Sequence, residues 1–236
     1  APPVAAPLLR LRLLGRIEAC WLGRPVLLPR HGAELLALLA LAGPAGISGD
    51  DLRDRLYGDP AASPHGLRKL LERVRKLMPG VVALDGAAYR LALPAGQLQA
   101  DLLTVRETPL ACQSLEELEL AASLAGQPLL PGSEEPWVLG ERETLRRRAV
   151  ELWLALADLA RERHAFELAV RAYQEARALS PLHERAVASS LRLNLDLGRH
   201  AEAVSVFLEY RSLLDDMLGL NPSPVVELLY KQALGA

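Results

Sequence analysis

Basic side chains crowd the segment HGLRKLLERVRKLM, residues 65 to 78, which holds five Lys and Arg residues and one acid in a chain of net charge −2. An arginine guanidinium is a planar fork that matches the edge of guanine, and a lysine ammonium acts mainly as a point charge near phosphates. The chemistry that this cluster indicates is binding of a polyanion such as DNA. Amphipathic helices also carry Lys and Arg on faces that only contact water. The elements that neighbour this segment in the sequence are therefore needed to distinguish a DNA-binding helix from an ordinary solvated one.

The same segment has one apolar and one charged face on a helical wheel of about 100° per residue. The apolar face comprises Leu67, Leu70, Leu71, Val74, Leu77 and Met78. The opposite arc comprises Arg68, Lys69, Glu72, Arg73, Arg75 and Lys76. We therefore expect the first face to pack within the domain and the second to be available to a ligand.

Three kinds of element precede this helix. Short runs that alternate apolar and polar residues, at 8–14, 17–22 and 25–28, predict a small antiparallel sheet. Residues 31–43 are apolar on nearly all sides, which predicts a buried helix. Ser48, three residues before Asp51, is an N-cap signal for a helix over 49–58, and Ser63 followed by Pro64 is a start signal for the basic helix.

A hairpin signal follows the basic helix. Residues 81–84 and 87–93 flank Asp85-Gly86, a pair that tolerates the positive φ of a tight hairpin turn. The order of sheet, three helices and hairpin is that of a winged helix, whose last helix enters the major groove while the hairpin contacts the adjoining backbone. The sequence thus predicts a winged-helix DNA-binding domain in residues 1–97, with Arg90 in its wing.

The remainder, residues 98–236, is predicted to be helical and contains an internal repeat. Ala169 aligns with Ala203 and Tyr173 with Phe207, each pair 34 residues apart, which is the tetratricopeptide period. We expect a mainly α chain with a small β component: a winged helix followed by a tetratricopeptide-like repeat domain. Pro109 predicts a break in the first helix of the second domain, and Ser114 with Glu117 forms a capping box for the next helix.

Charge separates the two predicted domains. Residues 1–97 hold 13 basic and 8 acidic side chains, a net charge of +5, whereas residues 98–236 hold 14 and 21, a net charge of −7. A positive domain suits a polyanion, and a negative domain avoids one. This distribution favours DNA binding by the first domain and leaves the second for proteins.

Catalytic and metal-site patterns are missing from the sequence. The two cysteines have no CxxC spacing, and the five histidines show no ligand spacing; His164 and His200 fall in corresponding turns between repeat helices. No nucleophile elbow, zinc-protease motif or phosphate-binding loop occurs. The longest apolar run, residues 35–43, is half of what a membrane span requires. We expect a cytoplasmic protein with no enzymatic activity, no cofactor, no metal and no membrane partner.

The chain resembles the SARP family of bacterial transcriptional activators, which join a winged helix of the response-regulator type to a bacterial transcriptional activator domain. In the first domain the resemblance rests on GRPVLLPR (23–30), ISGDDLRDRLYGD (47–59), LRKLLERVRKL (67–77) and YRLAL (89–93). In the second it rests on PLLPGSEEPWV (128–138), ERETLR (141–146), GRHAEAV (198–204) and LGLNPSPVVELLY (218–230). The order and spacing of these segments together make the likeness specific.

This resemblance implies a sequence-specific activator that binds double-stranded DNA at promoter repeats, recruits RNA polymerase and forms a homodimer on DNA. By the matching positions, Arg68, Arg73 and Arg75 are the recurring basic DNA contacts, and Lys69, Glu72 and Lys76 stand where members vary. Arg90 is the matching basic residue of the wing. The alternative function is a helical-repeat scaffold whose winged helix binds protein rather than DNA, since fold alone does not settle function.

Overall fold

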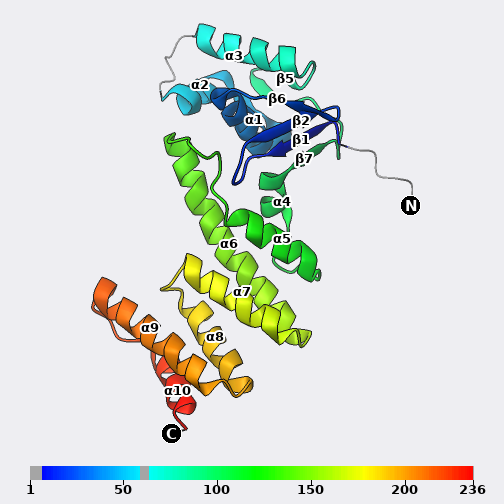
Figure 1. Cartoon of the computed structure of the whole chain (residues 1–236). Helices are drawn as coiled ribbons and strands as arrows, with labels where there is room; N and C mark the ends of the chain where they lie inside the picture. Colours follow the sequence, from blue (N-terminus) through cyan, green and yellow to red (C-terminus); the bar gives the residue numbers. More distant parts are fainter. Residues whose placement is uncertain (1–6, 59–63, 236) are drawn as a thin grey trace. The chain divides into compact units, whose positions relative to one another are not determined.

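The computed structural model describes residues 7–58 and 64–235. Two compact units divide the chain: residues 1–107 with 127–145, and residues 108–126 with 146–236. The chain therefore leaves the first unit, returns to it and leaves it again. Figure 1 shows that the first unit contains the strands and that the second is built from helices.

The first unit opens with a four-stranded sheet in the order β3-β2-β1-β7. Strands β1 (Leu9–Arg12), β2 (Glu18–Trp21) and β3 (Arg24–Val26) are antiparallel, as predicted. Strand β7 (Leu98–Ala100) pairs in parallel with β1 and was not predicted. The Asp101 carboxylate after β7 accepts hydrogen bonds from the backbone N–H groups of Leu13 and Leu14, each at 2.9 Å, and so joins the ends of the two strands.

Three helices form the core of this unit. The predicted buried helix is α1 (Arg30–Ala42), which is followed by the short 3₁₀ helix η1 (Gly43–Ala45). Helix α2 (Gly49–Tyr57) is capped as predicted, because the Ser48 side chain accepts from the Asp51 N–H; it ends at Gly58, whose φ of 68° suits glycine. The basic helix is α3 (Pro64–Leu77), and its predicted N-cap Ser63 lies outside the described residues.

The wing is a three-stranded sheet in the order β4-β6-β5, made of β4 (Ile47–Ser48), β5 (Val82–Asp85) and β6 (Ala88–Leu91). Its hairpin was predicted, but the loop is shifted by one residue. Asp85 pairs with Ala88, so the two loop residues are Gly86 and Ala87 rather than Asp85 and Gly86. Gly86, with φ of 59°, takes the first loop position, because a positive φ there is easiest for a residue without a Cβ.

A buried carboxylate connects α1 to the segment that precedes α6. Glu34 is fully buried; it accepts hydrogen bonds from Ser133 Oγ at 2.7 Å and Arg30 Nε at 3.0 Å, and His31 Nδ1 lies 2.7 Å away. Burial raises the pKa of Glu34, but the hydrogen bonds from Ser133, His31 and Arg30 outweigh it and lower the pKa from its usual value. A buried charge with this many partners fixes residues 127–135 in the first unit.

The helices that follow are α4 (Asp101–Glu107), α5 (Leu115–Ala125), α6 (Pro136–Glu162), α7 (Phe166–Leu179), α8 (Glu184–Asp196), α9 (His200–Leu218) and α10 (Pro224–Ala233). Helix α4 ends before Pro109, so the predicted break is present. The Ser114 side chain caps α5 by accepting from the Glu117 N–H, as predicted. Of the helices that the structure describes, none combines the length and apolar character that crossing a membrane requires.

The 34-residue repeat corresponds to two helix pairs, the second half of α6 with α7, and α8 with α9. Ala169 and Tyr173 of the first pair and Ala203 and Phe207 of the second are all buried, which confirms the predicted alignment. His164 has a left-handed φ of 58°, and Gly198, 34 residues later, has φ of 69°. The predicted fold class, a winged helix followed by helical repeats, is therefore confirmed.

Candidate DNA-binding interface

Helix α3 has one buried and one exposed face. Leu67, Leu70, Leu71 and Val74 are buried, and α3 packs on α1 and α2. Leu77 was predicted to share this face, but 39% of it is exposed. The helix ends at Leu77, and the buried Met78 just beyond it closes the core in its place.

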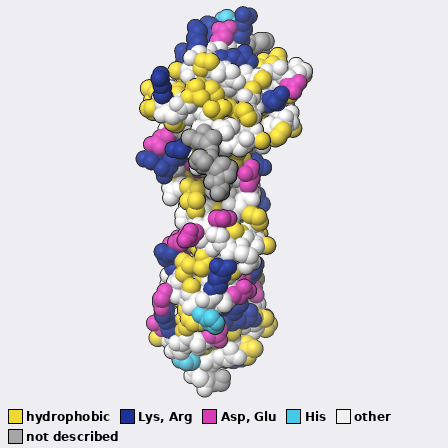
Figure 2. Space-filling view, turned by 90° about the vertical axis from the view of Figure 1, so that its right-hand side faces the viewer, with side chains coloured by type: hydrophobic (Ala, Val, Ile, Leu, Met, Phe, Trp, Pro, Cys, Tyr) yellow, Lys and Arg dark blue, Asp and Glu magenta, His cyan; other side chains and the backbone are white. Residues whose placement is uncertain are grey.

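The opposite face carries the predicted contact residues. Arg68, Lys69, Glu72, Arg73 and Lys76 are exposed, and Arg75 is half-buried. Figure 2 shows Lys and Arg side chains gathered over the part of the first unit that α3 forms in Figure 1. Within the described part of the chain, Lys69, Arg73 and Lys76 take part in no recorded ion pair. Their charges are therefore available to an external anion.

Arg68 is paired within the helix. Its Nε lies 3.1 Å from Glu72 Oε1, one turn along, and both side chains are largely exposed. An exposed pair of this kind is worth only about 0.3–0.5 kcal/mol, so DNA phosphates or bases can compete for Arg68 at little cost. Glu72 lowers the charge of the face by one and stands directly beside a predicted DNA contact.

Arg75 differs from the other basic residues of α3. Its Nε donates a hydrogen bond of 3.2 Å to the backbone carbonyl of Val82, the first residue of β5. One edge of its guanidinium therefore holds the wing against the helix. Sequence reasoning missed this contact, because nothing in the sequence shows that β5 starts beside the last turn of α3.

Arg90 is also engaged inside the protein. From β6 its Nε reaches Asp85 Oδ2 at 3.1 Å, across the hairpin. The pair is partly exposed and joins the two wing strands near their loop. The sequence indicated only that Asp85 is a turn residue. It forms an ion pair with Arg90 because the two residues lie diagonally across the hairpin from each other.

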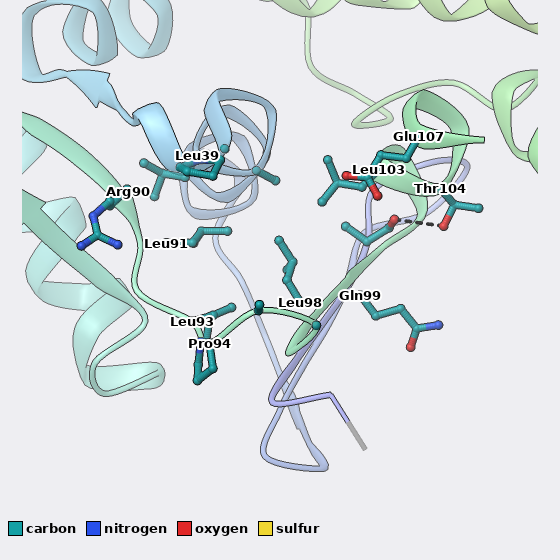
Figure 3. Close-up of a pocket in the computed structure, with 16 residues that line it drawn as sticks. Leu39, Arg90, Leu91, Leu93, Pro94, Leu98, Gln99, Leu103, Thr104 and Glu107 are labelled. Carbon is teal, nitrogen blue, oxygen red and sulfur yellow. Dashed lines mark hydrogen bonds between the residues drawn. The ribbon is translucent and has the colours of Figure 1, made fainter. Parts of the chain in front are cut away.

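A pocket of about 510 Å³ borders the wing between α1, β6, β7 and α4. Figure 3 shows Leu39, Leu91, Leu98 and Leu103 around it. Polar groups at its edge bond within the protein: Thr104 Oγ1 donates to the Ala100 carbonyl at 3.3 Å, and Arg90 bonds Asp85. The pocket is thus a cleft beside β6 whose lining is both apolar and polar, and it also includes Gln99 and Glu107.

The predicted site residues are brought together in one unit. The six charged positions of α3 lie on one helix, and Arg75 links that helix to the wing that carries Arg90. No cluster of His, Cys, Asp or Glu among the described residues has the arrangement of a metal site. What the arrangement offers chemically is an exposed cationic helix face with a paired hairpin beside it, the two elements with which winged helices contact DNA.

Comparison with known proteins identifies relatives over nearly the whole chain. Residues 97–234 match the family described as "Bacterial transcriptional activator domain". The chain is 28% identical, over 97% of its length, to the regulatory protein AfsR of Streptomyces coelicolor, and 27% identical, over 99%, to that of Streptomyces griseus. It spans about a quarter of the length of these relatives, 24% and 25%.

A solved structure shares the fold. Mycobacterium tuberculosis EmbR, determined in complex with a low-affinity phosphopeptide, superposes with a TM-score of 0.76 at 20% identity. The match covers 97% of this chain and 65% of that one. At this identity the likeness concerns the fold, which is that of a winged helix joined to helical repeats.

Proposed function

This chain belongs to the SARP family of bacterial transcriptional activators, and on that premise we propose that it binds specific promoter sequences through α3 and the wing. The observation that carries the proposal is the exposed cationic face of α3, whose other face is locked into the core. The contacts that we propose are Arg68, Lys69, Glu72, Arg73, Arg75, Lys76 and Arg90.

These residues have different roles in the proposal. Arg68 and Arg73, exposed on the middle of α3, read base edges, because a guanidinium can bond the guanine edge in bidentate fashion. Lys69 and Lys76 contact phosphates as point charges. Arg75 and Arg90 approach the backbone with the nitrogen atoms that the wing does not use.

The partners follow from the same proposal. The first sequence domain, residues 1–97, binds duplex DNA, and the second, residues 98–236, is left for protein contacts; the family match that starts at residue 97 supports this boundary. We further propose that the bound protein activates transcription by recruiting RNA polymerase, and that two copies occupy repeated promoter elements. The charges of the two sequence domains, +5 and −7, support this division of labour.

Selection of bound duplexes from a fragmented genomic pool tests the proposal. The parent protein and an Arg68→Ala, Arg73→Ala double variant are each incubated with the pool at about 150 mM salt, and the retained fragments are sequenced. Both substituted side chains are exposed, so the variant is expected to fold, and its melting temperature is the control.

Enrichment of a short repeated motif by the parent alone is the expected result. Enrichment of the same motif by both proteins would contradict the roles of Arg68 and Arg73. If neither protein enriches any sequence, the scaffold function, in which the winged helix binds protein, replaces the proposed one.

A further inference from the structure

The aromatic ring of Tyr57 lies against the first turn of α3. Tyr57 is the last residue of α2, and α2 packs on α3 (Figure 1). Gly66, the third residue of α3, has no side chain, and a Cβ placed there would lie 3.8 Å from both Cζ and the hydroxyl oxygen of Tyr57. That distance is one of ordinary van der Waals contact, so the ring closely covers the helix backbone two residues before Arg68.

His31 contacts the ring of Tyr57 from α1. The two ring centroids are 5.5 Å apart and the rings stand at 61° to each other, an edge-to-face arrangement that aromatic pairs prefer. His31 Nδ1 lies 2.7 Å from a carboxylate oxygen of Glu34, which is fully buried. Because hydrogen bonds from Arg30 and Ser133 hold this carboxylate in place, the imidazole keeps one orientation and limits the movement of the Tyr57 ring.

These contacts form a series within the first unit, from Ser133 to Glu34, from Glu34 to His31, and from His31 to Tyr57. Ser133 is 2% exposed and lies 99 positions after Glu34 in the sequence. Burial raises the pKa of Tyr57, and the negative charge of Glu34 raises it further, as expected for a half-buried ring near that carboxylate. The ring that covers α3 is therefore supported from behind by a buried and fully bonded charge.

Base readout and phosphate attraction depend differently on the position of α3. A hydrogen bond to a base edge weakens steeply when its distance or angle changes. The attraction between an arginine and a phosphate falls only gradually with distance. A small shift of the first turn of α3 therefore costs base contacts of Arg68 and leaves the general affinity for DNA almost unchanged.

We propose that Tyr57 determines DNA specificity by positioning the first turn of α3, so that Arg68 reaches the base edges. His31 and Glu34 hold Tyr57 in that position. This role presupposes the DNA binding proposed above. Tyr57 acts through the helix and not through a bond of its own to DNA, which distinguishes it from the cations of α3.

Two affinities of the full chain, for the selected motif and for a duplex of arbitrary sequence, test this role. Both are measured by fluorescence anisotropy at about 150 mM salt and calculated for the folded fraction, which circular dichroism gives for each variant. Tyr57→Leu removes the ring, His31→Gln keeps a donor for Glu34 but removes the imidazole, and Tyr57→Phe removes only the hydroxyl. The matched control is Tyr230→Leu, which breaks the stacked pair with Phe207 in the second unit.

The expected result is a change in the ratio of the two affinities. Tyr57→Leu and His31→Gln should lower the affinity for the motif by about fivefold or more, the scale of one lost base contact, and the affinity for the arbitrary duplex by less than about twofold. Tyr57→Phe and Tyr230→Leu should leave both affinities within about twofold of the parent.

A Tyr57→Leu variant that keeps the parent's ratio, or that loses both affinities by the same factor, would overturn the role of the ring. A loss in Tyr57→Phe as large as that in Tyr57→Leu would overturn it too, because the hydroxyl would then contact DNA directly. Where Tyr57→Leu does not fold, His31→Gln decides between the same results, since the His31 side chain is 43% exposed. A parent that prefers no motif would instead refute the DNA-binding function on which this role depends.

Discussion

Neutralising Glu72 should strengthen non-specific DNA binding. Glu72→Gln removes the one acid from the exposed face of α3 and frees Arg68 from its ion pair at 3.1 Å. A unit charge about 8 Å from a phosphate in water interacts by ~0.5 kcal/mol before screening, and the released Arg68 recovers about 0.3–0.5 kcal/mol. After screening at physiological salt, the sum is about 0.5–1 kcal/mol, or a two- to fivefold tighter complex.

Fluorescence anisotropy with a duplex of arbitrary sequence measures this effect across a salt series. The slope of log affinity against log salt should steepen by up to about 0.9, the value for one more neutralised phosphate. Glu18→Gln is a matched control, because Glu18 is equally exposed, at 52% against 53% for Glu72, and is also paired with an arginine at 3.2 Å, but lies on the sheet. An affinity that is unchanged by Glu72→Gln, or raised as much by Glu18→Gln, would refute the assignment of α3 as the helix that faces DNA.

Three further changes probe the elements that hold the site. Arg75→Lys keeps the positive charge but replaces the guanidinium that bonds the Val82 carbonyl with a lysine ammonium of different geometry. Backbone hydrogen exchange in β5 should therefore accelerate, while the dependence of DNA affinity on salt concentration stays the same. Unchanged exchange in β5 would show that Arg75 does not link the helix to the wing. Ala169→Trp places a large side chain where the structure has a fully buried methyl group. It should destabilise the second unit by about 1–3 kcal/mol or more, which would be measured as a lower melting temperature. An unaltered melting curve would contradict the packing of the repeat helices. Glu34, whose pKa is lowered in the folded chain, contributes stability above its ordinary value of 4.5 that is lost as pH falls through the folded pKa. The difference in melting temperature between the parent and Glu34→Gln should therefore narrow as the pH falls below 4.5 and through the lowered pKa of Glu34. A difference that stays constant with pH would show that the charge of Glu34 contributes nothing to stability.

Local signals in the sequence were sufficient for helices α1, α2, α3 and α5. Ser48 and Ser114 mark helix starts because each cap involves residues three apart, and the 34-residue spacing of Ala169 and Ala203 fixes which helices pair. The two faces of α3 follow from periodicity alone. Leu77 departs from it because the helix ends there, and Arg75, on the charged arc, departs from it because it is half-buried against β5.

Contacts between distant segments could not be predicted in this way. Pairing of β7 with β1 and the bond from Ser133 to Glu34 join residues about 90 to 100 positions apart, and no local pattern encodes them. The engagement of Arg75 and Arg90 by the wing depends on where a hairpin lies relative to a helix. Helical periodicity, the hairpin signal and the resemblance to the SARP family identified these arginines as candidates, whereas the structure shows how each is held.

Photocrosslinking from α3 tests the central claim most directly. Arg73 is exposed and forms no ion pair with the residues that the structure describes. A photoreactive side chain at this position is compared with the same group at position 192, which lies on the exposed surface of α8. The proposed function requires crosslinks from position 73 to bases of the selected motif and none from position 192. Crosslinks from position 192 alone, or none from position 73 on a duplex that is fully bound, would contradict recognition of DNA by α3.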